Sequence, residues 1–260
     1  MTTEDFIIDL FCRIDDPMKD VPRHSQAHLW PRETVTVGVW WGFKGGGERA
    51  LYRWLVRDSR PLFLRLPERS RLVRSLRTHR AWTYRLLAAP TLWGVIDTDG
   101  IELRHPRREG RSRTQWGRTG VSNPRWMVGG KWCRRLNRLA VIVGWSCGPA
   151  HVYDTRFHPL VNRVKSRRVV LADQSFPAAG DPPNLNLGRR GQWNDRMLVE
   201  TVLSLMTVVS HLTHVRHRGW DYLLARLAFL VTAVNLLLQG HGLPADEQGF
   251  VHLSLAEFSL

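Results

Sequence analysis

Two different patterns of apolar and polar residues follow one another along this chain of 260 residues. Up to about residue 90, apolar side chains recur at intervals of three and four, which is typical of amphipathic helices. The clearest helical stripe comprises Phe6, Ile7, Leu10, Phe11 and Ile14. From Arg32 to Trp41 the residues are apolar and β-branched, and periodicity does not distinguish a helix from a strand there. Residues 1–90 are therefore predicted to form a mainly helical region.

After Pro90 the pattern changes to short apolar runs that predict strands. These runs are residues 92–97, 125–133, 139–145 and 169–173, and residues 100–103 are a candidate continuation of the first strand past a kink. Between them the sequence predicts a polar, arginine-rich insertion over 105–123 and an amphipathic helix over 153–165, with Phe157, Leu160, Val161 and Val164 facing inward. Residues 177–191 are expected to be a loop, and a long helix is expected over about 219–239.

The order of these elements predicts an α/β domain with a mixed sheet. Three strands come first, and a helix then leads to a short, wholly apolar fourth strand. Because a crossover helix places parallel strands side by side, the fourth strand is expected to run parallel beside the first. Asp97 and Asp173 end these two strands. Their carboxylates are therefore expected at neighbouring positions, pointing the same way.

A third carboxylate, Glu200, lies on the helix that follows. Asn194 and Asp195 are good residues for its N-terminal cap, and apolar residues recur at helical spacing from Met197. Arg196 lies four residues before Glu200, so the two can pair on one face of the helix. Such pairs are usually structural. If this helix packs across the sheet edge, however, Glu200 joins the two aspartates.

A cluster of Asp97, Asp173 and Glu200 predicts a divalent-metal site with a catalytic role. Carboxylate oxygens are hard ligands that suit Mg²⁺ or Mn²⁺, and converging carboxylates need such ions to offset their repulsion. Two ions about 4 Å apart can activate the attacking oxygen and stabilise the leaving oxygen of a phosphodiester. Competing carboxylates are Asp99, Glu102 and Asp154. Asp99 is the strongest rival, because it shares a strand face with Asp97.

The charge of the chain indicates a nucleic-acid partner. The formal net charge is +15 and the pI is about 11.1. Most of the cations are arginines, whose planar fork binds phosphate in a bidentate manner. Coding bias would explain arginine in place of lysine but not the excess over acids, and a solvated face is the alternative for each ridge. The residues predicted to contact DNA are Arg49, Arg53, Arg57, Arg74, Arg77, Lys131 and Arg196.

Other features suggest an intracellular protein. The cysteines, Cys12, Cys133 and Cys147, are odd in number and widely spaced, which is typical of free thiols in a reducing compartment. No signal peptide is visible. The most apolar stretch, residues 223–238, contains Arg226 and Asn235 and is predicted to be a core helix rather than a membrane span. A cytoplasmic, nucleoid-associated protein without a membrane partner is expected.

The chain resembles the DDE transposases of bacterial insertion sequences. The resemblance is carried by Ile96-Asp97-Thr98, by residues 170–176 around Asp173, by Arg196 with Glu200, and by residues 48–55 before the core. It implies a helical DNA-binding region over 1–90, a ribonuclease-H-like catalytic domain over 91–240 and a tail over 241–260. It also implies a homodimer on double-stranded DNA, and metal-dependent cleavage and strand transfer at element ends with two Mg²⁺ or Mn²⁺ ions.

Two positions depart from the pattern of that family. Trp193 stands where the family commonly has tyrosine, and Thr207 stands where it commonly has a basic residue. The segment between Asp173 and Glu200 is also short and leaves little room for an inserted domain. The alternatives to an active transposase are a catalytically silent, transposase-derived DNA-binding protein and a ribonuclease-H-like nuclease without strand transfer. Retention of all three carboxylates favours activity.

Overall fold

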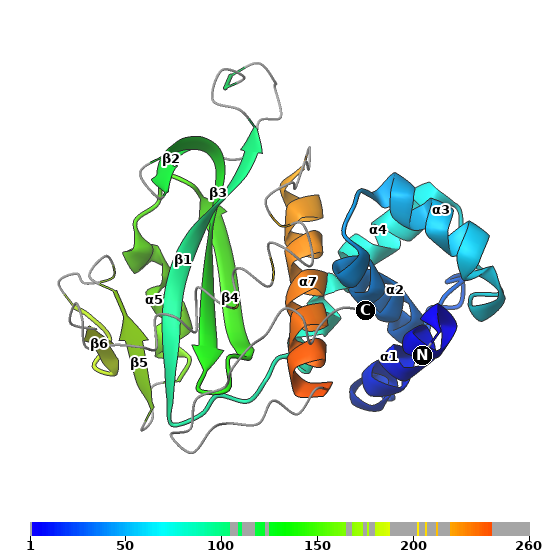
Figure 1. Cartoon of the computed structure of the whole chain (residues 1–260), viewed down its shortest axis with the longest axis horizontal. Helices are drawn as coiled ribbons and strands as arrows, with labels where there is room; N and C mark the ends of the chain where they lie inside the picture. The colour runs from blue at the N-terminus through cyan, green and yellow to red at the C-terminus, as the bar shows by residue number, and fades with distance from the viewer. Residues whose placement is uncertain are drawn as a thin grey trace. The chain divides into compact units, whose positions relative to one another are not determined.

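The computed structural model of the chain describes residues 2–104, 109–110, 118–122, 125–164, 168–173, 176, 180–187, 202, 206, 212 and 219–240. These residues fall into two compact units. Unit 1 contains residues 2–87 together with Asp221–Val234, and unit 2 contains the described residues from 88 to 220 and Asn235–Gly240. Figure 1 traces both along the chain.

Unit 1 is helical, as the periodicity of the first 90 residues predicts. Its helices are α1 (Thr3–Asp15), α2 (Pro31–Lys44), α3 (Glu48–Asp58) and α4 (Arg69–His79), with short 3-10 turns η1 (Asp16–Met18), η2 (Arg60–Leu62) and η3 (Arg80–Leu86). The apolar stripe of α1 buries Ile7, Leu10 and Ile14. Thr2 caps this helix, because its hydroxyl accepts the N–H of Asp5 at 3.1 Å.

The stretch that periodicity left undecided, residues 32–41, belongs to helix α2. Pro31 occupies the first turn of the helix, where its missing N–H costs no hydrogen bond, and the Glu33 carboxylate accepts the N–H of Trp30 at 2.6 Å. Every residue from Thr34 to Phe43 is buried. Because α2 is buried on all sides, its sequence carries no polar face, and this explains why its pattern was ambiguous.

Helix α7 (Trp220–Gly240) contributes residues 221–234 to unit 1. It is long and apolar enough to cross a membrane, but 78% of its most apolar window is buried within the protein. Such burial is typical of a core helix in a soluble protein and confirms the expectation of a core helix. The N-terminal part of unit 1 thus ends at Leu87, and unit 1 also includes residues 221–234 of this later helix.

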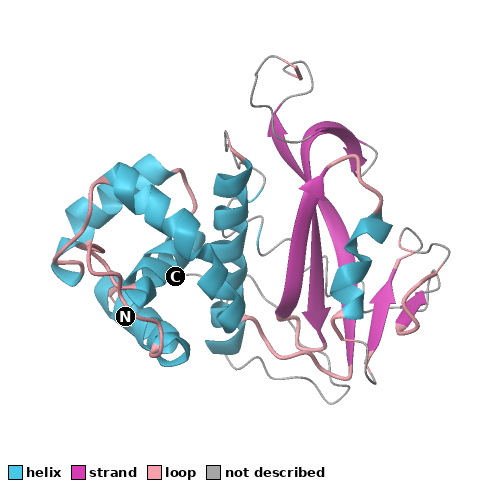
Figure 2. Cartoon of the chain, turned by 180° about the vertical axis from the view of Figure 1, so that it is seen from behind, coloured by secondary structure: helices cyan, strands magenta, loops and turns pink. Residues whose placement is uncertain are grey.

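Unit 2 is an α/β unit built on a six-stranded mixed sheet, shown by Figure 2 in magenta. Its strands are β1 (Trp93–Arg104), β2 (Arg118–Ser122), β3 (Arg125–Asn137), β4 (Ile142–Pro149), β5 (Val169–Ala172) and β6 (Leu185–Leu187). Strand β3 is antiparallel to β1, β2 and β4, whereas β1 and β5, and then β5 and β6, pair in parallel. The predicted parallel pairing of the first and fourth expected strands is thus confirmed.

Several local predictions were wrong. The expected insertion over 105–123 contains strand β2, and the expected loop over 177–191 contains strand β6. Both strands are short, and they form because β3 and β5 offer them partners, which no local pattern reveals. The third expected strand begins at Ile142 rather than Leu139, because the chain turns at Ala140 with a positive φ of 63°.

A short helical segment covers one face of the sheet in Figure 1. It consists of the 3-10 turn η5 (Asp154–Phe157) and helix α5 (His158–Asn162), and is shorter than the helix expected over 153–165. The four residues predicted to face inward are all buried. They belong to a core cluster of Ile96, Cys133, Phe157, Leu160, Val161, Val164, Val170, Ala172 and Phe176. Since Ile96 faces this core, the next side chain of β1, Asp97, faces the opposite side of the sheet.

Candidate active site

Asp97 and Asp173 are in phase on neighbouring parallel strands. The pairing of β1 with β5 runs from Trp93 opposite Val169 to Val95 opposite Leu171. Asp97 and Asp173 each lie two residues beyond that last pair. Because side chains alternate with a period of two, both carboxylates belong to the same face of the sheet as Val95 and Leu171. Asp97 is half-buried, and Asp173 is exposed directly after the end of β5.

The surroundings of Asp97 disfavour a lone negative charge. Burial, the largest cause, and the neighbouring carboxylates of Asp99 and Asp173 raise the pKa of Asp97 from 3.8 to about 6, although Arg134 and the N–H of Thr98 act in the opposite sense. That N–H donates to Asp97 Oδ1 at 2.8 Å. The electrostatic effect of Asp173 on Asp97 agrees with the in-phase register of the two strands. A cation beside Asp97 would relieve these costs.

Asp99, the rival first ligand, has a cationic partner within the protein. Arg134 lies on β3 opposite Asp97, and its Nη2 donates to Asp99 Oδ2. The guanidinium of Arg134 is fully buried and stacks 4.8 Å from the ring of Trp132. Asp99 therefore already has a buried cationic partner, and Asp97 is the better candidate for an incoming cation. The position of Arg134 was not predicted, because its pairing with Asp99 spans 35 residues.

The two described carboxylates fit a divalent cation by the chemistry of their donors. Both supply hard oxygen ligands, and a cation would offset the repulsion between their charges. Glu200, the predicted third ligand, lies outside the described residues, as do Trp193, Arg196 and Thr207. Among the residues that the structure describes, no group of three or more His, Cys, Asp or Glu side chains is arranged to hold a metal.

The other rival carboxylates lie on the opposite side of β1. Asp154 is 7% exposed, and its Oδ1 accepts both the Thr98 hydroxyl and the Lys131 ammonium, each at 2.9 Å. Alternation along β1 also places Glu102 on the opposite face from Asp97. Lys131 was predicted to meet the DNA backbone, but its side chain is only 15% exposed and is paired with Asp154. This ion pair has no local signature, because its partners are 23 residues apart.

The predicted DNA-contacting arginines of unit 1 lie on α3 and α4. Arg49, Arg53, Arg57 and Arg74 are exposed, while Leu51 and Leu55 bury the other side of α3. Arg57 also pairs with Asp58 at 2.6 Å.

Arg77 differs from the other arginines of this set. It is half-buried, donates to the Tyr222 hydroxyl at 3.0 Å and stacks 4.7 Å from that ring. Its guanidinium therefore has a role in packing within unit 1 that the spacing of the arginines did not indicate.

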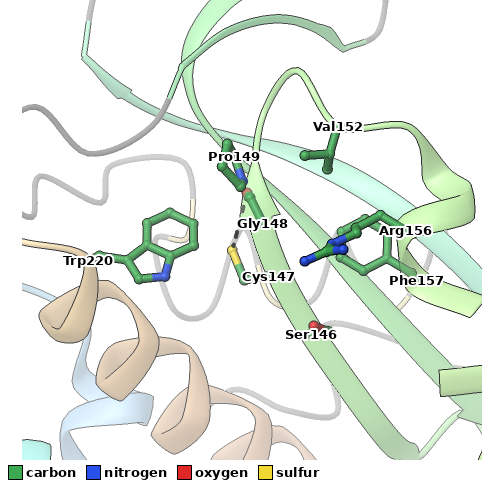
Figure 3. Close-up of a pocket in the computed structure, with 8 residues that line it drawn as sticks. All are labelled: Ser146, Cys147, Gly148, Pro149, Val152, Arg156, Phe157 and Trp220. Atoms are coloured by element: carbon green, nitrogen blue, oxygen red, sulfur yellow. Dashed lines mark hydrogen bonds between the residues drawn. The ribbon is translucent and has the colours of Figure 1, made fainter. Parts of the chain in front are cut away.

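A cavity of about 320 Å³ lies at the edge of strand β4, as Figure 3 shows. Trp220 and Cys147 line one side, and Arg156 and Phe157 line the other. Burial raises the pKa of the Cys147 thiol to about 12, so this cysteine is a neutral thiol and a poor nucleophile near neutral pH. Of the predicted site residues that the structure describes, none lines this cavity.

Comparisons of the chain with protein-family models, with curated proteins and with solved structures find no match. Function is therefore inferred from the residues of the chain itself.

Proposed function

We propose that the protein is a DDE transposase that cuts and joins DNA at the ends of an insertion sequence. The observation that carries this proposal is the parallel register of β1 and β5, which puts Asp97 and Asp173 in phase on one sheet face. The sheet supports it as well. Strands β1, β3 and β4 form an antiparallel set, and β5 and β6 follow in parallel on the other side of β1. A ribonuclease-H-like core would have this strand order, so the order supports the proposal.

In this proposal arginine side chains bind the DNA, and carboxylate side chains bind the metal ions that catalyse the reaction. Two Mg²⁺ or Mn²⁺ ions would supply activation of the attacking oxygen and stabilisation of the leaving oxygen. Asp97, Asp173 and Glu200 would hold those ions, and Arg134 pairs with Asp99 beside them. The exposed arginines of α3 and α4 contact phosphates and position the duplex. The partners are element ends and target DNA, with a homodimer on DNA in the cytoplasm at the nucleoid.

The proposal predicts that loss of any one carboxylate abolishes cleavage but not DNA binding. Asp97→Ala, Asp173→Ala and Glu200→Ala are assayed in Mg²⁺ and Mn²⁺ for nicking of a supercoiled plasmid. They are also assayed for joining of a pool of duplexes with randomised 3′ ends to that plasmid. Cleavage should fall by at least about a thousandfold, because a metal cluster that lacks one anionic ligand no longer forms correctly. Binding is measured in parallel by fluorescence anisotropy.

Glu102→Gln is the matched control, because it removes a carboxylate from the same strand but from the opposite face. It should retain cleavage. Asp99→Asn is assayed beside it as the rival ligand, although its loss leaves the buried Arg134 without its partner. If Asp97→Ala cuts at the wild-type rate while Asp99→Asn is inactive, Asp99 is the ligand. Nicking without joining identifies a nuclease without strand transfer, and binding without either reaction identifies a silent DNA-binding protein.

A further inference from the structure

The segment formed by η5 and α5 contacts the chain beside both candidate ligands. At its first residue, Asp154 accepts the hydroxyl of Thr98, the residue after Asp97. One helical turn later, His158 Nε2 lies 2.8 Å from the carbonyl oxygen of Phe176. Since a carbonyl only accepts, His158 is the donor. The segment thus joins the middle of strand β1, at the residue after Asp97, to Phe176, which follows Asp173 by three residues.

The Asp97 end of this connection is held by a buried ion pair. Asp154 Oδ1 receives the Thr98 hydroxyl and the Lys131 ammonium at 2.9 Å each, on the face of β1 that carries the core cluster. The backbone N–H of the same Thr98 donates to Asp97 Oδ1 at 2.8 Å on the other side. Thr98 therefore lies between the buried ion pair and the candidate ligand, with one hydrogen bond to each.

The Asp173 end is held by packing and by a second hydrogen bond. Phe176 is fully buried in the core cluster with Phe157 of η5, and its N–H donates to the carbonyl oxygen of Asp173 at 3.4 Å. His158 donates to the carbonyl of that same Phe176. Phe176 is therefore held against the η5–α5 segment by its side chain and by its carbonyl, and its N–H is bonded to Asp173.

The sheet alone does not fix the spacing of the two carboxylates. The pairing of β1 with β5 ends at Val95 and Leu171, two residues before Asp97 and Asp173. Beyond that point the η5–α5 segment contacts both sides, through Thr98 and through Phe176. A small shift of this segment would change the separation of Asp97 from Asp173, and metal ligands must be held within a few tenths of an ångström.

We propose that Thr98, Asp154 with Lys131, and His158 are positioning residues that set the separation of Asp97 and Asp173 for divalent metal. This inference rests on the proposed function, because it takes the two aspartates as ligands. A stabilising role alone is a poor explanation of the buried pair, since buried ion pairs contribute little net stability. Removing Lys131 alone would leave a buried, uncompensated carboxylate, so Thr98 is the better position to test.

The test compares Thr98→Val with Thr98→Ser in the full-length chain. Valine keeps the shape of threonine but has no hydroxyl, whereas serine keeps the hydroxyl bonded to Asp154. Mn²⁺ binding is measured by electron paramagnetic resonance without DNA, and the melting temperature is recorded for each variant. We expect Mn²⁺ affinity to fall about tenfold in Thr98→Val and less than twofold in Thr98→Ser, as for other residues that orient metal ligands.

Equal Mn²⁺ affinities for the two Thr98 variants would overturn this inference. If Thr98→Val does not fold, His158→Leu against His158→Gln makes the same comparison at the other end of the segment, because glutamine can still donate to the carbonyl of Phe176. Asp97→Asn separates the two proposals. If it binds Mn²⁺ as tightly as wild type, the proposed function itself fails; if it loses binding while Thr98→Val does not, only the positioning role is wrong.

Discussion

At the scale of single residues, the surroundings of Asp97 oppose its negative charge. The sequence places it at the end of an apolar run, and the structure adds partial burial and the neighbouring Asp99. A carboxyl in such a place keeps its proton to a higher pH than in the unfolded chain. The resulting cost at neutral pH is one that a bound cation would remove.

Asp97→Asn is expected to stabilise the metal-free protein above pH 7. The pKa of Asp97 is raised from 3.8 to about 6 in the folded chain, so the folded state holds more protons between these values. The free energy of unfolding therefore falls as pH rises from about 4 to about 6, by at most about 3 kcal/mol. Asparagine carries no charge, so the variant does not lose this stability as the pH rises. The free energy of unfolding of wild type and variant is measured by urea unfolding in chelator at pH 4 and pH 7.5. A difference between the two proteins that is equal at both pH values would contradict the prediction.

At the scale of elements, the approach of α2 to α7 within unit 1 depends on glycine. A Cβ placed on Gly38 would lie 2.4 Å from the Phe229 ring, and one on Gly42 would lie 2.9 Å from both the Ala233 methyl and the Phe229 carbonyl oxygen. These glycines are four residues apart in a buried helix, so they form one smooth stripe against α7. Two helices of low polarity thereby pack with their backbones unusually close.

Gly38→Ala is expected to lower the stability of the protein by about 1–3 kcal/mol. The added methyl has no room beside Phe229, and overpacking of a tight core costs about that much, although alanine favours a helix more than glycine does. Gly47→Ala is the matched control, because a Cβ there meets nothing within 4 Å. Thermal unfolding of both variants is the measurement. A melting temperature of Gly38→Ala equal to that of Gly47→Ala would show that α2 and α7 separate easily.

At the scale of the whole molecule, the net charge is +15, and the arginines that contribute to it are of two kinds. Some are paired with an acidic side chain of the protein, and others are exposed without such a pair among the described residues. Arg49 and Arg53 are exposed on α3, and no ion pair to either is found within the described part of the chain. Arg13 and Arg85, by contrast, pair with Asp9 at 2.9 Å and with Asp20 at 2.5 Å. Arg49 and Arg53 should therefore bind phosphate, whereas Arg13 and Arg85 already have an anionic partner.

Binding of double-stranded DNA should therefore weaken steeply with salt, and the two kinds of arginine should contribute differently. Arg49→Gln with Arg53→Gln should reduce the slope of log affinity against log salt by about 1.8, because each lost phosphate contact removes about 0.9. Arg13→Gln with Arg85→Gln removes the same formal charge and should change the slope by less than half as much. Fluorescence anisotropy between about 50 and 200 mM salt measures both slopes. Equal slopes for the two double variants would exclude α3 as the phosphate-contacting surface.

The sequence by itself determined which segments form the sheet core and how the first and last expected strands run. Apolar periodicity predicted the inward residues of α5 and the helical N-terminal region, because burial of apolar surface leaves a local pattern. The order of strands and helix was sufficient to predict the parallel pairing of β1 with β5, since crossover connections leave few alternatives. The in-phase placement of Asp97 and Asp173 follows from that pairing.

Only the tertiary structure decided which polar groups meet. Three contacts join residues that are far apart in the chain. Arg134 pairs with Asp99, Lys131 pairs with Asp154, and Arg77 stacks on Tyr222. The short strands β2 and β6 likewise exist because a neighbouring strand pairs with them. Local pattern records which side chains are buried, but the partner of each charge is set by how distant elements pack, and in unit 2 that packing leaves Asp97 as the carboxylate better placed for a cation than Asp99.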